Sequence, residues 1–84
     1  MQARFVPSAE PQDVDVDDRV VSIVGHTRDV PHLRVFWWGR DSSGEVVVLE
    51  ETHKGLKDVT SRTRGQHQYA TVLPKVQQIT FNKA

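Results

Sequence analysis

The sequence predicts an all-β fold: a small antiparallel barrel or sandwich of five to six strands, of SH3-like or OB-like size, with an irregular N-terminal arm. Three observations predict this class. Segments rich in β-branched and aromatic residues recur, their links contain Gly or Pro, and no long stretch has helical periodicity. Because 84 residues suffice for only one domain, we divide the chain into an acidic arm, residues 1–18, and a single β domain, residues 19–84.

The arm is predicted from Pro7 and Pro11 and from the scarcity of large apolar residues around them. Within it, residues 3–6 are expected to add a short edge strand. The next segment, Arg19 to Gly25, is rich in branched residues and is predicted to be a strand. A loop is expected over residues 26–32.

An aromatic hairpin is the most informative feature of the chain. It is predicted over residues 33–38 and 45–50, which are joined by the turn-forming stretch 39–44. A turn centred on residues 40–43 would place Trp37 opposite Val46 and Trp38 opposite Glu45.

Both faces of this hairpin are apolar, whereas a half-buried strand alternates apolar and polar residues. One face carries Leu33, Val35 and Trp37, and the other carries Arg34, Phe36 and Trp38. The remaining apolar residues can cover the first face, namely Val20, Ile23, Val24, Val72, Ile79 and Phe81. We therefore expect the face of Phe36 and Trp38 to meet a partner. The alternative is that both tryptophans fill a small core.

The C-terminal part is predicted to be loop and strand. Residues 53–68 are polar and basic, with Gly55 and Gly65 as breakers, so a loop with at most one helical turn is expected. Strands are expected at residues 68–73 and 76–81, separated by Pro74 and Lys75.

Charges are segregated along a chain whose formal net charge is zero. Residues 1–18 carry a net charge of −4, residues 19–51 of −1 and residues 52–84 of +5. Two arrangements account for this polarity. Either the acidic head folds back over the basic tail, or the two ends face different partners or neighbouring copies in a head-to-tail assembly.

Catalytic, cofactor and metal signatures are lacking in the sequence. There is no cysteine, and His26, His32, His53 and His67 do not fall into a metal-ligand spacing. The acidic run from Asp13 to Asp18 lacks the glycine and the distal glutamate of a calcium loop. Ser42 and Ser43 lie in a predicted turn without a nucleophile motif. We therefore expect no catalytic residue, no metal and no cofactor.

Nucleic-acid binding is the alternative function. Basic loops beside aromatic residues grip single strands and backbone phosphates in small barrels. The candidate contacts in the basic segment 53–69 are Lys54, Lys57, Arg62, Arg64 and Tyr69. Against this alternative, the sequence pI is about 6.9, whereas dedicated binders are usually basic.

The function favoured by the sequence is a non-enzymatic protein–protein interaction module. It would act as a structural subunit of a larger assembly, for example a phage particle by analogy, or as a small inhibitor that occludes a partner's surface. The predicted interface residues are Arg34, Phe36, Trp38 and Arg40, since aromatic residues and arginine are common interface anchors. A protein partner or a homo-oligomer is expected, without a membrane or a small-molecule substrate. No signal peptide or membrane span is evident, so a cytoplasmic or virion-associated location is expected.

Overall fold

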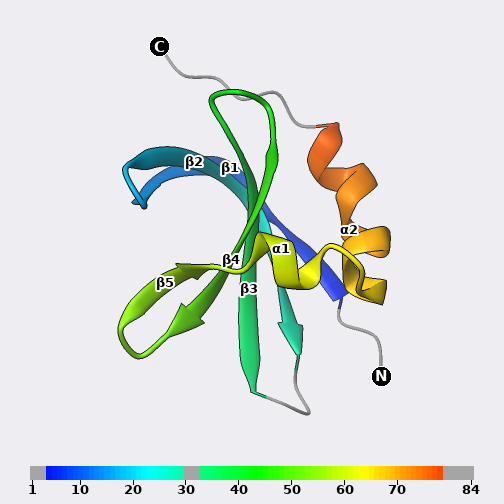
Figure 1. Ribbon diagram of the computed structural model, residues 1–84. Coiled ribbons are helices and arrows are strands. Elements are labelled where there is room, and N and C mark those ends of the chain that lie inside the picture. The colour runs from blue at the N-terminus through cyan, green and yellow to red at the C-terminus, as the bar shows by residue number, and fades with distance from the viewer. Residues whose placement is uncertain (1–3, 30–32, 79–84) are drawn as a thin grey trace.

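A single antiparallel meander with one helix across it forms the structure, which is a computed structural model describing residues 4–29 and 33–78 (Figure 1). The strands are β1 (Arg4–Val16), β2 (Arg19–Asp29), β3 (Arg34–Asp41), β4 (Val46–Thr52) and β5 (Gly55–Asp58), and the helices are α1 (Thr60–Thr63) and α2 (His67–Gln77). In the described ranges, the sheet has the order β1-β2-β3-β4-β5. Its edge strands β1 and β5 approach each other without closing a barrel. The prediction of a small all-β fold is confirmed.

The segment predicted as an irregular arm is instead the longest strand of the described residues. Strand β1 pairs with β2 through a turn in which Asp17 and Asp18 have φ angles of 52° and 63°. Two successive residues with positive φ are typical of a tight hairpin turn, and aspartate tolerates this conformation better than most residues do. The acidic run therefore forms a hairpin whose tip carries two carboxylates.

Two glycines allow the sheet to bend. The β1–β2 register shifts between Pro7 and Gln12, and the β2–β3 register shifts between Ile23 and Gly25. A Cβ on Gly25 would lie 2.2 Å from the Phe5 ring, and one on Gly39 would lie 2.0 Å from the backbone oxygen of Ser22. Such irregularities increase local twist, and here they accompany the curl of the β1–β2 hairpin that Figure 1 shows.

The aromatic hairpin is confirmed as two paired strands, but its predicted register is wrong. Trp37 lies opposite Leu49 instead of Val46, and Trp38 lies opposite Val48 instead of Glu45. The cause is the turn. The Asp41 carboxylate accepts hydrogen bonds from the Ser43 and Glu45 backbone amides, both at 3.0 Å, and Gly44 adopts a φ of 89°. This closes the hairpin over residues 42–44 and shifts the pairing by three positions.

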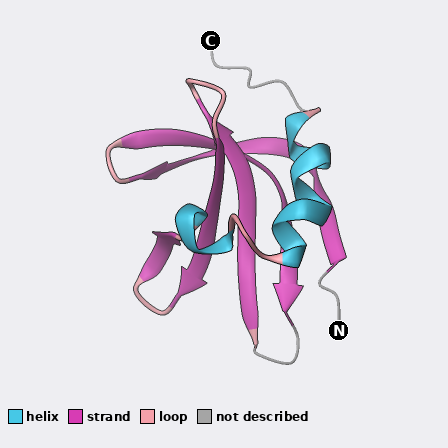
Figure 2. Ribbon diagram, turned by 45° about the vertical axis from the view of Figure 1, so that its right-hand side comes forward, coloured by secondary structure: helices cyan, strands magenta, loops and turns pink. Residues whose placement is uncertain are grey.

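Helix α2 replaces the strand predicted at 68–73 and the start of the one predicted at 76–81, whose remaining residues 79–81 lie outside the described part. Tyr69, Val72 and Val76 are the buried residues of α2, and their spacing places them on one face of a helix. The helix includes Pro74, which cannot donate a backbone hydrogen bond. Packing of the apolar face against the sheet prevails over local β propensity (Figure 2).

Each face of the sheet has its own apolar cluster. The cluster under α2 includes Phe5, Phe36, Trp38, Val48, Tyr69 and Val72. The cluster on the opposite face consists of Val16, Val21, Ile23, Val47 and Leu49, with Val14, Trp37 and Leu56 packed against it. Ile79 and Phe81, predicted to contribute to the core, lie outside the described residues. The sheet is therefore apolar on both sides, as the hairpin sequence indicates.

Candidate interaction surfaces

The predicted interface face of the hairpin is the interior of the protein. Phe36 is 5 % exposed and Trp38 is fully buried. The Trp38 indole nitrogen donates to the Thr27 hydroxyl at 3.0 Å, and the indole ring centre lies 5.8 Å from that of Tyr69. The expectation that this face remains uncovered is wrong, because α2 covers it. Phe36 and Trp38 are not available to a partner in this structure.

The two predicted interface arginines lie on the same face of β3, farther from the helix-covered core. Arg34 is exposed, and its Nε lies 4.0 Å from a Glu50 carboxylate oxygen. Arg40 is half-buried opposite Val46. Leu33, predicted to share the core side with Trp37, is 89 % exposed just before β3.

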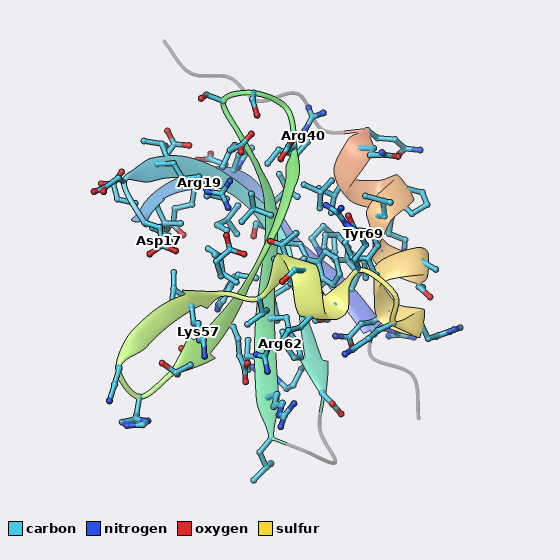
Figure 3. All side chains as sticks on the ribbon, in the orientation of Figure 1. Asp17, Arg19, Arg40, Lys57, Arg62 and Tyr69 are labelled. Atoms are coloured by element: carbon cyan, nitrogen blue, oxygen red, sulfur yellow. The ribbon has the colours of Figure 1, made fainter. Side chains whose placement is uncertain are left out.

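The structure brings together part of the predicted basic segment. Arg62 in α1 lies 3.0 Å from Glu50, Lys57 is the cross-strand partner of Glu50, and Arg34 approaches the same carboxylate. We call Arg34, Lys57 and Arg62 the basic patch. Figure 3 shows Asp17 at the hairpin tip, with Lys57 on β5 and Arg62 on α1 below it. Within residues 4–29 and 33–78, no ion pair joins Asp17 or Asp18 to this patch.

The other predicted nucleic-acid contacts lie elsewhere. Lys54 is exposed in the β4–β5 turn, and Arg64 is exposed after α1. Tyr69 is 8 % exposed and points from α2 toward the sheet (Figure 3). Its ring is therefore not available to stack on a base.

A second surface, which the sequence analysis does not identify, lies on the face of the sheet opposite α2. Cross-strand pairing aligns Val6, His26 and Trp37 in one row and Arg4, Arg28 and Val35 in the next. Leu56 lies on the same face, beside Glu51. We call this surface the Trp37 face and define it by Arg4, Val6, His26, Arg28, Trp37 and Leu56.

Trp37 lies at the centre of this face and is only half-buried. Its ring centre lies 4.9 Å from that of His26, at an interplanar angle of 45°. Its indole nitrogen points to a Glu51 carboxylate oxygen at 3.4 Å, a long hydrogen bond. Beside it is a shallow cavity of about 300 Å³, lined by Gln12, Val14, Ile23, Trp37, Glu51 and Leu56. The cavity offers room for an apolar side chain against the indole.

Two arginines flank the aromatic pair. Arg4 and Arg28 are directly opposite each other on β1 and β2, and both are exposed. Within residues 4–29 and 33–78, neither guanidinium forms an ion pair. Like charges directly across a ladder destabilise a sheet. An anionic group placed between the two guanidinium groups would remove that repulsion.

The edges of the sheet are poorly suited to pairing with another strand. Strand β1 contains Pro7 and Pro11, which lack backbone N–H donors. Strand β5 has only 4 residues and carries the exposed Lys57. Proline, lysine and short length are devices that protect sheet edges from strand addition. A partner is therefore more readily received on a face of this sheet than at an edge.

Another cavity, of about 790 Å³, lies at the β1–β2 turn and is lined by Asp15, Asp17, Asp18, Arg19, Val20 and Ser42. Arg19 at its border is engaged in a structural network. It donates to Asp41 at 2.9 Å and also to Asp58, so it joins β2 to the β3–β4 turn and to the β5–α1 junction. The Asp58 carboxylate also accepts from the Thr60 backbone amide at 2.9 Å.

The protonation of the two aspartates follows from this network. Burial raises the pKa of Asp41, but hydrogen bonds from Ser43 and Glu45 and the Arg19 charge outweigh it and hold the pKa below its usual range. Burial likewise raises the pKa of Asp58, and hydrogen bonds from Thr60 and Arg19 outweigh it, so that this pKa is also lowered. Both carboxylates are therefore ionised partners of Arg19 at neutral pH, which fits a structural role.

The described residues contain neither a cluster of metal ligands nor a membrane-spanning helix. In the part of the chain that the structure describes, no three His, Asp or Glu side chains group into a metal site. No helix among the described residues is long and apolar enough to cross a membrane.

Comparisons with protein-family models, curated proteins and solved structures find no match for this chain.

Sequence reasoning missed the Trp37 face for one identifiable reason. Arg4 and Val6 belong to it only because residues 4–16 form a strand, and that segment is predicted to be an arm. The alternation of His26 and Arg28 with the buried Thr27 in β2 indicates a strand with two different faces. This indication was missed because a loop was expected at residues 26–32.

Proposed function

We propose that this protein is a non-enzymatic protein–protein interaction module, acting as an assembly subunit or as an inhibitor, and that its partner docks on the Trp37 face. One observation carries the proposal. A half-buried indole lies beside a cavity and one cross-strand row from two exposed guanidinium groups that form no ion pair with another described residue, on the sheet face opposite α2.

The chemistry of this face suits a binding hot spot. Tryptophan and arginine are enriched among the residues that dominate interface energies, especially where an apolar pocket is surrounded by polar groups. Here the cavity beside Trp37 is apolar toward Val14, Ile23 and Leu56, and it has a carboxylate at its rim in Glu51. The face thus offers an apolar pocket with a carboxylate at its rim, and a pair of positive charges farther along the β1–β2 ribbon at Arg4 and Arg28.

Site-specific photo-crosslinking in the cells that produce the protein tests the proposal. A photoreactive phenylalanine analogue replaces the exposed Val6 on the Trp37 face, and in a matched control it replaces the exposed Gln77 on α2. We expect a discrete protein adduct from position 6 and none from position 77. The adduct should disappear when Trp37→Ala is added. Equal adducts from both positions, or none from either, would contradict the proposal.

Nucleic-acid binding remains the second candidate, and the basic patch favours it. Arg34, Lys57 and Arg62 surround one carboxylate, so the patch keeps a local positive charge. Backbone phosphates are bound by such groups in a strongly salt-dependent way. The measurement is a mobility shift with single- and double-stranded DNA and RNA at about 50 mM salt.

A shift that is lost on Lys57→Ala with Arg62→Ala, and kept in Lys75→Ala, would support this second function. No shift at that salt concentration would exclude it. Lys75 is a suitable control because it is exposed on α2, where its ammonium lies 5.9 Å from the Phe5 ring centre.

A further inference from the structure

The geometry points to a second copy of this chain as the partner: we propose that the acidic β1–β2 turn of one copy docks on the Trp37 face of the next, in a head-to-tail chain. This inference rests on the proposed function and identifies its partner.

Charge complementarity is the first argument. The turn presents Asp17 and Asp18, both exposed and adjacent in the chain, with backbone φ angles of 52° and 63°. The face presents Arg4 and Arg28, which are exposed and directly opposite each other. Neighbouring residues in a chain have Cα atoms about 3.8 Å apart, and cross-strand partners have Cβ atoms about 5 Å apart. Two carboxylates on adjacent residues can therefore each reach one of two guanidinium groups on opposed residues.

Shape is the second argument. A two-residue turn is a narrow projection, and Figure 1 shows the β1–β2 turn extending from the body of the protein. The cavity beside Trp37 is shallow, at about 300 Å³, and is suited to a few side chains rather than to a broad surface. Val20 is only half-buried beside the turn and can contact the indole of the next copy.

The placement of these two features favours contact between copies. The Arg4–Arg28 pair is at one end of the β1–β2 ribbon, and the turn at residues 17–18 is at its other end. The turn of one copy is therefore separated from its own arginine pair by the length of the ribbon, and a neighbouring copy can supply the matching surface. A contact between unlike surfaces of this kind is heterologous, and it extends into a filament or closes into a ring. Because the net charge of the chain is zero, copies do not repel each other as a whole.

Two variants with complementary defects test this inference. Asp17→Asn with Asp18→Gly removes both carboxylates from the turn and installs the residue pair that such turns favour most, so the fold is preserved. Arg4→Glu with Arg28→Glu reverses the charge of the face and leaves the turn intact. Lys54→Glu with Arg64→Glu is the matched control, because it makes the same change in net charge at exposed positions outside the Trp37 face.

The measurement is sedimentation velocity over a range of concentrations at about 50 mM and about 500 mM salt. For the parent and the control, we expect an average mass that rises above 9.6 kDa with concentration and does not level off at a dimer. Because the contact is ionic and exposed, its affinity should fall at least about tenfold at the higher salt concentration. Asp17→Asn with Asp18→Gly, and Arg4→Glu with Arg28→Glu, should each remain a monomer when studied alone.

Mixing the turn variant (Asp17→Asn with Asp18→Gly) with the face variant (Arg4→Glu with Arg28→Glu) gives the decisive result. Each retains one functional surface, so we expect pairs of one copy of each variant and no longer species. A parent that is monomeric at every concentration would overturn the inference, as would a closed dimer or a mixture that does not pair. If the parent is monomeric while position 6 still crosslinks to another protein, only the identity of the partner is wrong. If neither is seen, the proposed function fails as well.

Discussion

Trp37 and Trp38 are neighbours in β3, yet their surroundings differ completely. Trp38 is fully buried under α2 and its indole nitrogen is hydrogen-bonded to Thr27. Trp37 points to the other face, is half-buried, and has a shallow cavity beside it. The difference shows that an apolar pair in a strand does not reveal which member is accessible. That depends on the element that covers each face, and here a helix late in the chain covers one of them.

Trp38→Ala is expected to have the largest effect on stability. Truncation of a fully buried tryptophan leaves a cavity and costs about 3 to 5 kcal/mol of the free energy of unfolding, which is close to the whole stability of many small domains. It also leaves the Thr27 hydroxyl without its indole donor. Urea unfolding followed by circular dichroism measures the change. A loss below about 1 kcal/mol would contradict the buried position of Trp38.

Gly39→Ala is expected to have the next largest effect on stability, because β3 and β2 approach each other closely at Gly39. The added Cβ would lie 2.0 Å from the Ser22 oxygen, so the strands must move apart, at a cost of about 1 to 3 kcal/mol. Gly65→Ala is the matched control, since its Cβ would have no neighbour within 4 Å. Thermal unfolding of both variants should show a much lower midpoint for Gly39→Ala. Equal midpoints would show that the bend tolerates a side chain.

Asp41→Asn tests the network that holds the β3–β4 turn against β2. The Asp41 pKa is lowered in the folded state, so the folded protein holds the proton less tightly than the unfolded chain does. The stabilising contribution is therefore present above the ordinary pKa, about 4, and is lost as the pH falls through the lower folded pKa. We expect Asp41→Asn to cost about 1 to 2 kcal/mol at pH 7.

Urea unfolding of the parent and of Asp41→Asn at pH values from 7 to 2 measures this dependence. The parent should lose stability as the pH falls below about 4, and the variant should lose less over that range because one of the two perturbed carboxylates is gone. Parallel curves for the two proteins would refute the role assigned to Asp41.

Trp37→Ala should have the smallest effect on stability and the largest effect on binding. Because the indole is half-buried and its hydrogen bond to Glu51 is long, we expect a loss of about 1 kcal/mol, well below that of Trp38→Ala. The same variant should abolish the position-6 crosslink. A loss of stability equal to that of Trp38→Ala would place Trp37 in the core and would remove the distinction between the two faces.

The sequence indicated the fold class and the hairpin well, and the reasons are local. Strand β4 and the start of β3 are dense in β-branched and aromatic residues, and glycines flank the turn between them. The hairpin register was missed because it depends on the hydrogen bonds that the Asp41 carboxylate accepts from the backbone amides of the turn. Strand β1 was missed because its prolines occupy a sheet edge, where a missing N–H costs little.

Helix α2 was the most consequential error for the candidate site. Residues 68–73 have the composition of a strand, and only the spacing of Tyr69, Val72 and Val76 indicates a helix. That helix covers Phe36 and Trp38, so the predicted interface became the core. Trp37, on the opposite side, is then the more accessible tryptophan of the same hairpin.

By itself, the sequence determined that this chain is a small β protein with an aromatic hairpin that is apolar on both faces and with charges segregated along its length. Residue composition and the alternation of apolar and polar residues decide these properties, because both depend only on residues that are close in the sequence. Only the tertiary structure decided which tryptophan is buried, where Arg4 meets Arg28, and which carboxylate lies among the residues of the basic patch. Those outcomes depend on packing between distant segments, which local preference does not encode.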